Sequence, residues 1–278
     1  MFLTRAARYG FPALVTLLLV AVTAAPAMAQ EAPASSPVVA VSGGIDFVNT
    51  YMFRGIRQNS SGLATWPYFD LGVAAFEGEG ALKKVSFNLG SWNSAHSDPG
   101  GWYESDVYGT LGLAFGGGVS LGTTYTSYTS PDDRFTHVKE LAVKLAVDDS
   151  AYLGAGALKP YALFAFEMGA EPGKYQADGG SKAGRYLELG VAPGVSGARA
   201  SLAVPVKLGL SVGNYYELDG VDSTFGFFSA AGIVTVPLGS HWNVHGGAEV
   251  QALGDATKAL NGGDGERVVG SIGLGFAY

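Results

Sequence analysis

The four histidines are the first candidates for chemistry in this chain, because it contains no cysteine and an imidazole titrates near neutral pH. They are His96, His137, His241 and His245. His245 shares one side of an alternating segment with Glu249, but four residues of strand span about 13 Å, too far for one hydrogen bond. The same spacing separates His241 from His245, which argues against a shared metal ion. No serine is paired with any of them by spacing, so we expect no enzyme activity, no metal and no cofactor.

Charged residues on the polar side of the alternating segments are the second candidates. Counted by period 2, the acidic ones outnumber the basic ones. Two roles stay open for them: they select which solutes pass through a lumen, as rings of one charge do in pores, or they brace the wall in ion pairs. The acidic surplus predicts a weak preference for cations or neutral solutes. The predicted lumen-lining residues are Asp46, Arg54, Asp70, Lys84, Glu104, Asp106, Glu140, Lys144, Glu188, Lys207, Glu249 and Arg267.

Alternation of apolar and polar residues is the main structural signal, and it is clearest in residues 202–212. Leu202, Val206 and Leu210 share one side there, while Lys207 shares the other. Period 2 over this length predicts a strand. The same pattern predicts about twelve strands along the chain, although it does not fix the register of 158–170 and 225–237. The strands are expected near residues 41–57, 67–76, 84–94, 102–115, 118–129, 136–147, 158–169, 185–193, 199–215, 224–237, 241–254 and 265–278.

These strands predict an all-β fold, a closed antiparallel up-and-down transmembrane β-barrel, rather than a soluble sandwich. Only 15% of residues are charged, which is too few for the outside of a soluble domain. In a barrel the apolar faces meet lipid, the small polar residues line the lumen, and closure pairs the backbone groups that lipid cannot hydrogen-bond. The 42 glycines and the alanines further predict open lumenal space, narrowed by Met52, Tyr68 and Tyr108.

Aromatic residues near the expected strand ends predict girdles at the two membrane interfaces. The candidates are Tyr51, Phe53, Trp66, Tyr68, Trp102, Tyr125, Tyr128, Tyr215, Tyr216, Trp242 and Tyr278.

The expected connections differ in character between the two ends of the barrel, as in outer-membrane barrels. The mostly short ones are 77–81, 116–118, 148–150, 193–197 and 238–240, and the mostly longer, more polar ones are 59–66, 93–101, 130–134, 171–184, 217–223 and 255–266. The last strand, GSIGLGFAY, ends on Tyr278, which resembles the C-terminal targeting signal of bacterial outer-membrane proteins. We therefore expect the barrel-assembly machinery and outer-membrane lipid as partners, with both chain ends in the periplasm.

The N-terminal residues predict export. Residues 1–29 combine Arg5 and Arg8, an apolar run and an A-x-A site, which predicts a cleaved signal peptide. Residues 30–40 predict a flexible lead-in, and residues 41–278 a single barrel domain without a spanning helix. The 17 basic and 24 acidic residues argue against nucleic acid as a partner.

Three stretches carry a resemblance to a known family: GGIDFVNTYMFRGIRQ (43–58), FNLGSWNS (87–94) and ESDVYGTLG (104–112). They resemble a family of bacterial outer-membrane porins of undetermined role, sometimes called TorF-like, whose first strand typically reads S-D-Y-x-F-R-G-x-S-Q. The matching residues are Tyr51, Phe53, Arg54, Gly55 and Gln58, and the departing ones, which leave a related barrel family open, are Asn49, Thr50 and Arg57. The resemblance implies a barrel and a porin, and no substrate.

We therefore expect an outer-membrane porin through which small hydrophilic solutes diffuse passively. The rival expectation is a non-conducting barrel that serves as a scaffold for surface loops, in adhesion or membrane integrity.

Overall fold

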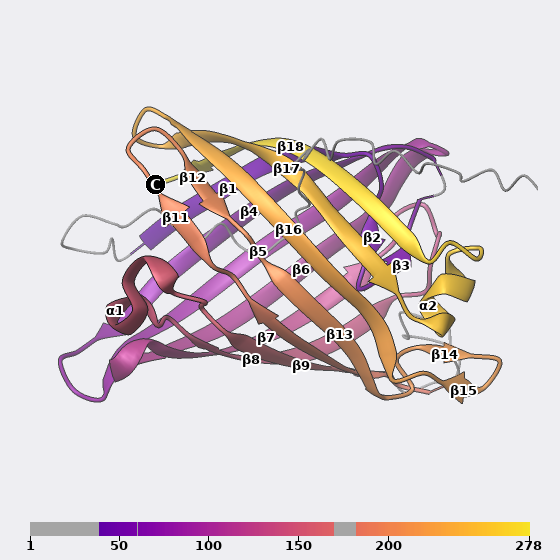
Figure 1. Ribbon diagram of the computed structural model, residues 1–278, viewed down its shortest axis with the longest axis horizontal. Helices are drawn as coiled ribbons and strands as arrows, with labels where there is room; N and C mark the ends of the chain where they lie inside the picture. Colours follow the sequence, from indigo (N-terminus) through magenta and orange to yellow (C-terminus); the bar gives the residue numbers. More distant parts are fainter. Residues whose placement is uncertain (1–38, 60, 170–181) are drawn as a thin grey trace, which may run out of the picture.

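The main feature of the computed structural model, which describes residues 39–59, 61–169 and 182–278, is a closed ring of antiparallel strands (Figure 1). The main sheet contains 14 strands. Two of them are short continuations: β11 (Gly194–Ser196) follows β10, and β12 (Ser201–Ala203) leads into β13. The ring therefore has 12 strand positions, and the ladder between β1 and β18 closes it. This confirms the predicted all-β, closed antiparallel barrel.

The wall strands follow one another around the ring in chain order. They are β1 (Val39–Val48), β4 (Ser61–Glu77), β5 (Leu82–Asp98), β6 (Gly100–Phe115), β7 (Val119–Thr129), β8 (Val138–Val147), β9 (Tyr161–Glu167), β10 (Arg185–Val191), β13 (Val206–Gly213), β16 (Phe225–Leu238), β17 (Trp242–Leu253) and β18 (Glu266–Ala277).

The two ends of the barrel carry different connections. Figure 1 places the C-terminus and the helix α1 (Ser150–Leu153) at one end, which we call the terminal end. The helix α2 (Asp255–Leu260) and the hairpin β14 (Glu217–Leu218) to β15 (Val221–Asp222) lie at the other, the loop end. The 3₁₀ turns η1 (Gly116–Gly118) and η2 (Gly154–Gly156) belong to connections at the terminal end.

The outer face of the ring is apolar. On β5, Phe87 and Leu89 are 53% and 58% exposed, and the residue between them, Asn88, is half-buried. Exposed apolar surface costs roughly 25 cal/mol per Å² in water, whereas a barrel in a bilayer covers the same surface with lipid. Among the described residues, no helix combines the length and the apolar character needed to cross a bilayer.

The first predicted strand, 41–57, is too long. β1 ends at Val48, and the chain then forms a small hairpin of β2 (Met52–Phe53) and β3 (Ile56–Arg57). The turn of this hairpin holds Arg54 and Gly55 with positive φ values of 47° and 81°, and glycine adopts such values without strain. Alternation cannot separate a short hairpin from a continuing strand, because both place successive side chains on opposite sides.

Two of the predicted long loops are mostly strand. Residues 61–66 begin β4, and residues 93–98 and 100–101 belong to β5 and β6, which Pro99 alone connects. Their polar residues had predicted loops, but strands extend here beyond the apolar part of the wall. The predicted signal peptide and most of the predicted lead-in and of the loop 171–184 lie outside the described residues.

Candidate functional site

Residues 49–59, which we call the lumenal segment, leave the wall after β1 and run inside the ring. Tyr51 packs against aromatic rings of β4 and β5, with centroids 5.2 and 5.4 Å away. Phe53 packs against a ring of β7 at 5.7 Å, and the carbonyl of Gly55 accepts a hydrogen bond of 2.7 Å from Asn261, beyond β17. One short segment can touch strands on opposite sides of a closed ring only from within it.

Arg54 anchors the lumenal segment to the wall. Its guanidinium donates two hydrogen bonds to the carboxylate of Glu140 on β8, at 2.6 and 2.8 Å, and one to the Tyr215 hydroxyl at 3.0 Å. Its Cζ lies 4.2 Å from the ring centroid of Tyr186 on β10. The side chains of Arg54 and Glu140 are only 12% and 4% exposed, so each would be a buried, unpaired charge without the other.

Buried aromatic residues fill much of the lumen near the lumenal segment. One cluster includes Tyr51 and Trp66, and a second includes Tyr215 and Tyr216. The prediction that these four residues belong to an interfacial girdle is wrong, because they point into the ring. The girdle candidates that do lie exposed are Trp102, Tyr125, Trp242 and Tyr278.

Several glycines hold space for these rings rather than leaving the lumen open. A Cβ at Gly90 would overlap the ring of Tyr108 on the neighbouring strand, and a Cβ at Gly226 would overlap the ring of Tyr216. The expectation that the glycines create open space is therefore wrong at these positions, since the rings of neighbouring residues occupy it.

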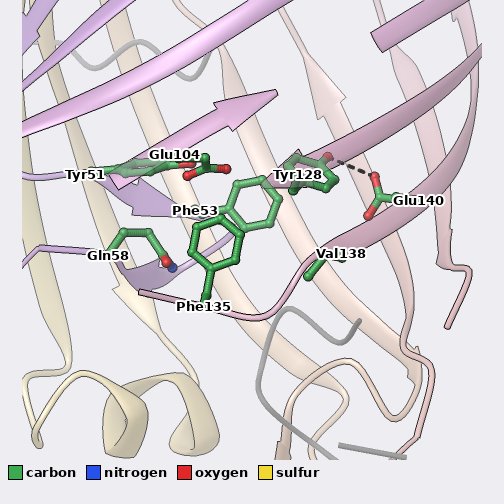
Figure 2. Close-up of a pocket in the computed structure, with 8 residues that line it drawn as sticks. All are labelled: Tyr51, Phe53, Gln58, Glu104, Tyr128, Phe135, Val138 and Glu140. Carbon is green, nitrogen blue, oxygen red and sulfur yellow. Dashed lines mark hydrogen bonds between the residues drawn. The ribbon is translucent and has the colours of Figure 1, made fainter. Parts of the chain in front are cut away.

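A cavity of about 50 Å³ lies between the lumenal segment and the wall (Figure 2). Figure 2 shows the rings of Phe53 and Phe135 at its centre, the carboxyl group of Glu104 beside Tyr51 and the Tyr128 hydroxyl bonded to Glu140. Its lining residues are Tyr51, Phe53, Gln58, Glu104, Tyr128, Phe135, Val138 and Glu140. The cavity thus combines four aromatic side chains with two carboxyl groups.

A second pair of polar side chains meets across β18, the last wall strand. Asp46 on β1 and His245 on β17 both lie in register with Gly273 on β18, and Asp46 Oδ1 lies 2.6 Å from His245 Nε2. A Cβ at Gly273 would overlap both groups. The glycine therefore lets residues of two non-adjacent strands bond across the inner wall.

The inner wall of β8, β9 and β10 carries a polar network of its own. The Tyr161 and Tyr186 hydroxyls both donate to Glu188, at 2.7 and 2.6 Å, and Lys144 Nζ lies 4.2 Å from the Tyr161 ring centroid. Lys144 and Glu188 are half-buried.

The structure places the twelve predicted lumen-lining residues in three settings. The sequence predicted Arg54 on a wall strand, but the structure places it at the tip of the lumenal segment. Lys84 and Arg267 lie near strand ends and pair with Glu77 and Asp264. The remaining residues are buried or half-buried on wall strands: Asp46, Asp70, Glu104, Asp106, Glu140, Lys144, Glu188, Lys207 and Glu249.

Two histidines lie beside serines, which the sequence spacing did not reveal. His137 Nε2 lies 2.8 Å from the hydroxyl of Ser127 on the adjacent strand β7, and His96 Nε2 lies 3.1 Å from that of Ser94. Burial lowers the pKa of His137, and the charge of Lys139 lowers it further. Sequence spacing paired no serine with a histidine, whereas the fold brings two such pairs together. The absence of enzyme activity stays a prediction.

No protein-family model matches the chain, and a search of curated proteins found no match. Among solved structures, an outer-membrane channel from Pseudomonas putida F1 is similar, with 12% identity, a TM-score of 0.49, and coverage of 90% of this chain and 100% of that one. The NanC porin is also similar, with 12% identity, a TM-score of 0.43, and coverage of 86% of this chain and 98% of that one. The outer-membrane phospholipase A of Escherichia coli has 10% identity, a TM-score of 0.46, and coverage of 84% of this chain and 92% of that one. These outer-membrane barrels include a channel, a porin and a phospholipase.

Proposed function

We propose that the chain is a bacterial outer-membrane porin in which small hydrophilic solutes diffuse through a lumen constricted by the lumenal segment. The carrying observation is the difference between the two halves of the inner wall. Near the terminal end, Asn88, Ser120 and Lys144 are only half-buried, whereas Trp66 and Trp92 near the loop end are buried. Half-exposed polar side chains on an inner wall are expected where water enters a barrel.

The outer-membrane location is part of this proposal. It is supported by the predicted signal peptide, the apolar outer face and the alternation of the wall strand β18. The resemblance of residues 43–58 to the TorF-like porins supports the same location, and membership of that family is itself a proposal. With both chain ends in the periplasm, as expected from the sequence, the terminal end faces the periplasm and the lumenal segment lies toward the cell exterior.

A non-conducting scaffold is the second candidate, and the pair of Arg54 and Glu140 favours it. A bidentate, buried ion pair holds the lumenal segment firmly, and the aromatic clusters around the segment occupy the lumen near the loop end. If this closure is permanent, the barrel presents its loops without passing solutes.

Single-channel recording from the purified barrel in a planar bilayer distinguishes these functions. The porin proposal predicts stepwise currents. The absence of such currents at every voltage would refute the porin and support the non-conducting scaffold. Reversal potentials in a salt gradient then test the weak cation preference that the surplus of lumenal carboxylates predicts, since an anion-selective channel would contradict it.

A further inference from the structure

Two buried carboxyl groups, Glu104 and Asp106, lie at or near the cavity beside the lumenal segment, and only Glu104 of the two lines it. Glu104 and Asp106 alternate on β6 and are each 5% exposed. The groups that act on Glu104 are Asp106 and Tyr51, and those that act on Asp106 are Glu104, Glu140 and the backbone of Thr129. None of these groups is itself a cation, and Glu140, which also lines the cavity, is already paired with Arg54.

Asp106 also has an unused hydrogen-bonding atom. Its Oδ1 is buried and has no hydrogen-bond partner among the described residues. In register, Asp106 lies directly opposite Tyr128 of β7, and Tyr128 lines the cavity. A buried acceptor without a partner costs free energy. Asp106 lies two residues from Glu104 on β6, so a cation bound at Glu104 would lie near this acceptor.

The remaining lining of the cavity suits an organic cation. Tyr51, Phe53, Tyr128 and Phe135 contribute aromatic rings around Glu104 (Figure 2). The face of an aromatic ring attracts a cation, and the attraction grows when water is excluded. Bare inorganic cations instead prefer shells of oxygen atoms, which the rings do not provide.

One cationic side chain of the protein, Arg54, is already held in this manner beside the cavity. The guanidinium of Arg54 is held by the carboxylate of Glu140 and lies against the rings of Phe53 and Tyr186, with Cζ 5.0 and 4.2 Å from their centroids. The cavity offers the same two elements, a carboxylate and aromatic faces, around empty space.

We propose that this cavity binds small organic cations with a primary ammonium group, held by Glu104 and Asp106 and enclosed by the aromatic rings. A volume of about 50 Å³ holds only a few non-hydrogen atoms, because by the same measure one water needs roughly 10–15 Å³. Methylammonium fits this space, and a longer amine would fit with its ammonium end only. The assignment of such cations as transported solutes rests on the proposed porin function, whereas their binding does not.

Isothermal titration of the purified, detergent-solubilised barrel with methylammonium chloride tests the proposal. Total ionic strength is held constant with sodium chloride, so that sodium ions compete throughout. We expect saturable binding of methylammonium, with an affinity at least tenfold lower in Glu104→Gln. The matched control is Asp70→Asn, which makes the same carboxyl-to-amide change on the inner wall, at a group bonded to Tyr108, and should bind like the unaltered barrel.

The outcomes separate the cation site from the porin function. Lack of saturable binding, or equal affinity in Glu104→Gln, would overturn the site even if the barrel conducts. Saturable binding by a barrel that passes no current would support the site and refute the porin. Should Glu104→Gln fail to fold, Asp106→Asn replaces it, with the same tenfold loss expected and equal affinity counting against the site.

Discussion

Substituting Gly273 by alanine should break the bond between Asp46 and His245. The new Cβ would overlap both groups, which now meet over the glycine with 2.6 Å between Oδ1 and Nε2. Their side chains are 5% and 12% exposed, so water would replace the lost bond poorly. A hydrogen bond to a charged group contributes about 1.5–3 kcal/mol, and we expect Gly273→Ala to lower the free energy of unfolding by that amount.

The matched control for this change is Gly122→Ala on β7, because a Cβ at Gly122 would meet nothing within 4 Å. This substitution should be neutral or stabilise by up to about 1 kcal/mol, since alanine restricts the unfolded chain. Urea unfolding of both variants in lipid vesicles, followed by tryptophan fluorescence, measures the difference.

A double-mutant cycle tests the cause. In an Asp46→Ala/His245→Ala background both the bond and the two groups that the new Cβ would overlap are absent, so Gly273→Ala should add less than about 0.5 kcal/mol. The reasoning is refuted if Gly273→Ala is as stable as Gly122→Ala, or if its full cost persists without Asp46 and His245.

Three further predictions concern the outer wall, the lumenal segment and a turn. Leu89→Arg, at a 58% exposed site, should destabilise the barrel in lipid vesicles by about 2–4 kcal/mol. The neighbouring substitution Asn88→Arg, which points inward, should cost less. Equal free energies of urea unfolding for the two variants would contradict a lipid-facing wall. Arg54→Met should lower the free energy of unfolding by about 3–5 kcal/mol, because it leaves Glu140 buried and unpaired. The double variant Arg54→Met/Glu140→Leu should recover most of that loss in the same assay. If it recovers none, the unpaired carboxylate is not the cause of the loss. Hydrogen bonds from Ser150 lower the pKa of Asp148 in the turn after β8. The contribution of Asp148 to the stability of the fold is therefore present above its pKa in the unfolded chain, and it disappears as the pH falls through its pKa in the folded protein. Because Asp148 is largely exposed, Asp148→Asn should cost under about 1 kcal/mol at neutral pH and nothing at lower pH; a loss independent of pH would contradict this.

The wall of the barrel could be predicted from the sequence because it depends on local alternation. In GSIGLGFAY, the pattern placed Gly273 on the lumenal side and Ile272 on the lipid side, and Ile272 is indeed 60% exposed. The pattern could not predict what Gly273 separates, since Asp46 and His245 come from two other strands and meet only after the ring has closed.

The lumenal segment escaped prediction for a related reason. Residues 49–57 continue the alternation of the first strand, and what draws them inside is contact with partners such as Glu140 and Tyr215, far away in the chain. Likewise, an aromatic residue near a strand end fits an interfacial girdle and a lumenal cluster equally well. Trp66 is buried and Trp242 exposed, although composition and spacing describe both alike.

The account depends most on the claim that the lumenal segment constricts a lumen otherwise open to water. Replacing residues 50–58 by a short glycine–serine turn should remove the constriction and leave the wall strands unchanged. Single-channel conductance of this variant, compared with the unaltered barrel in the same bilayer, measures the effect directly. We expect steps several times larger in the variant, and steps of equal size, or none in either protein, would contradict the account.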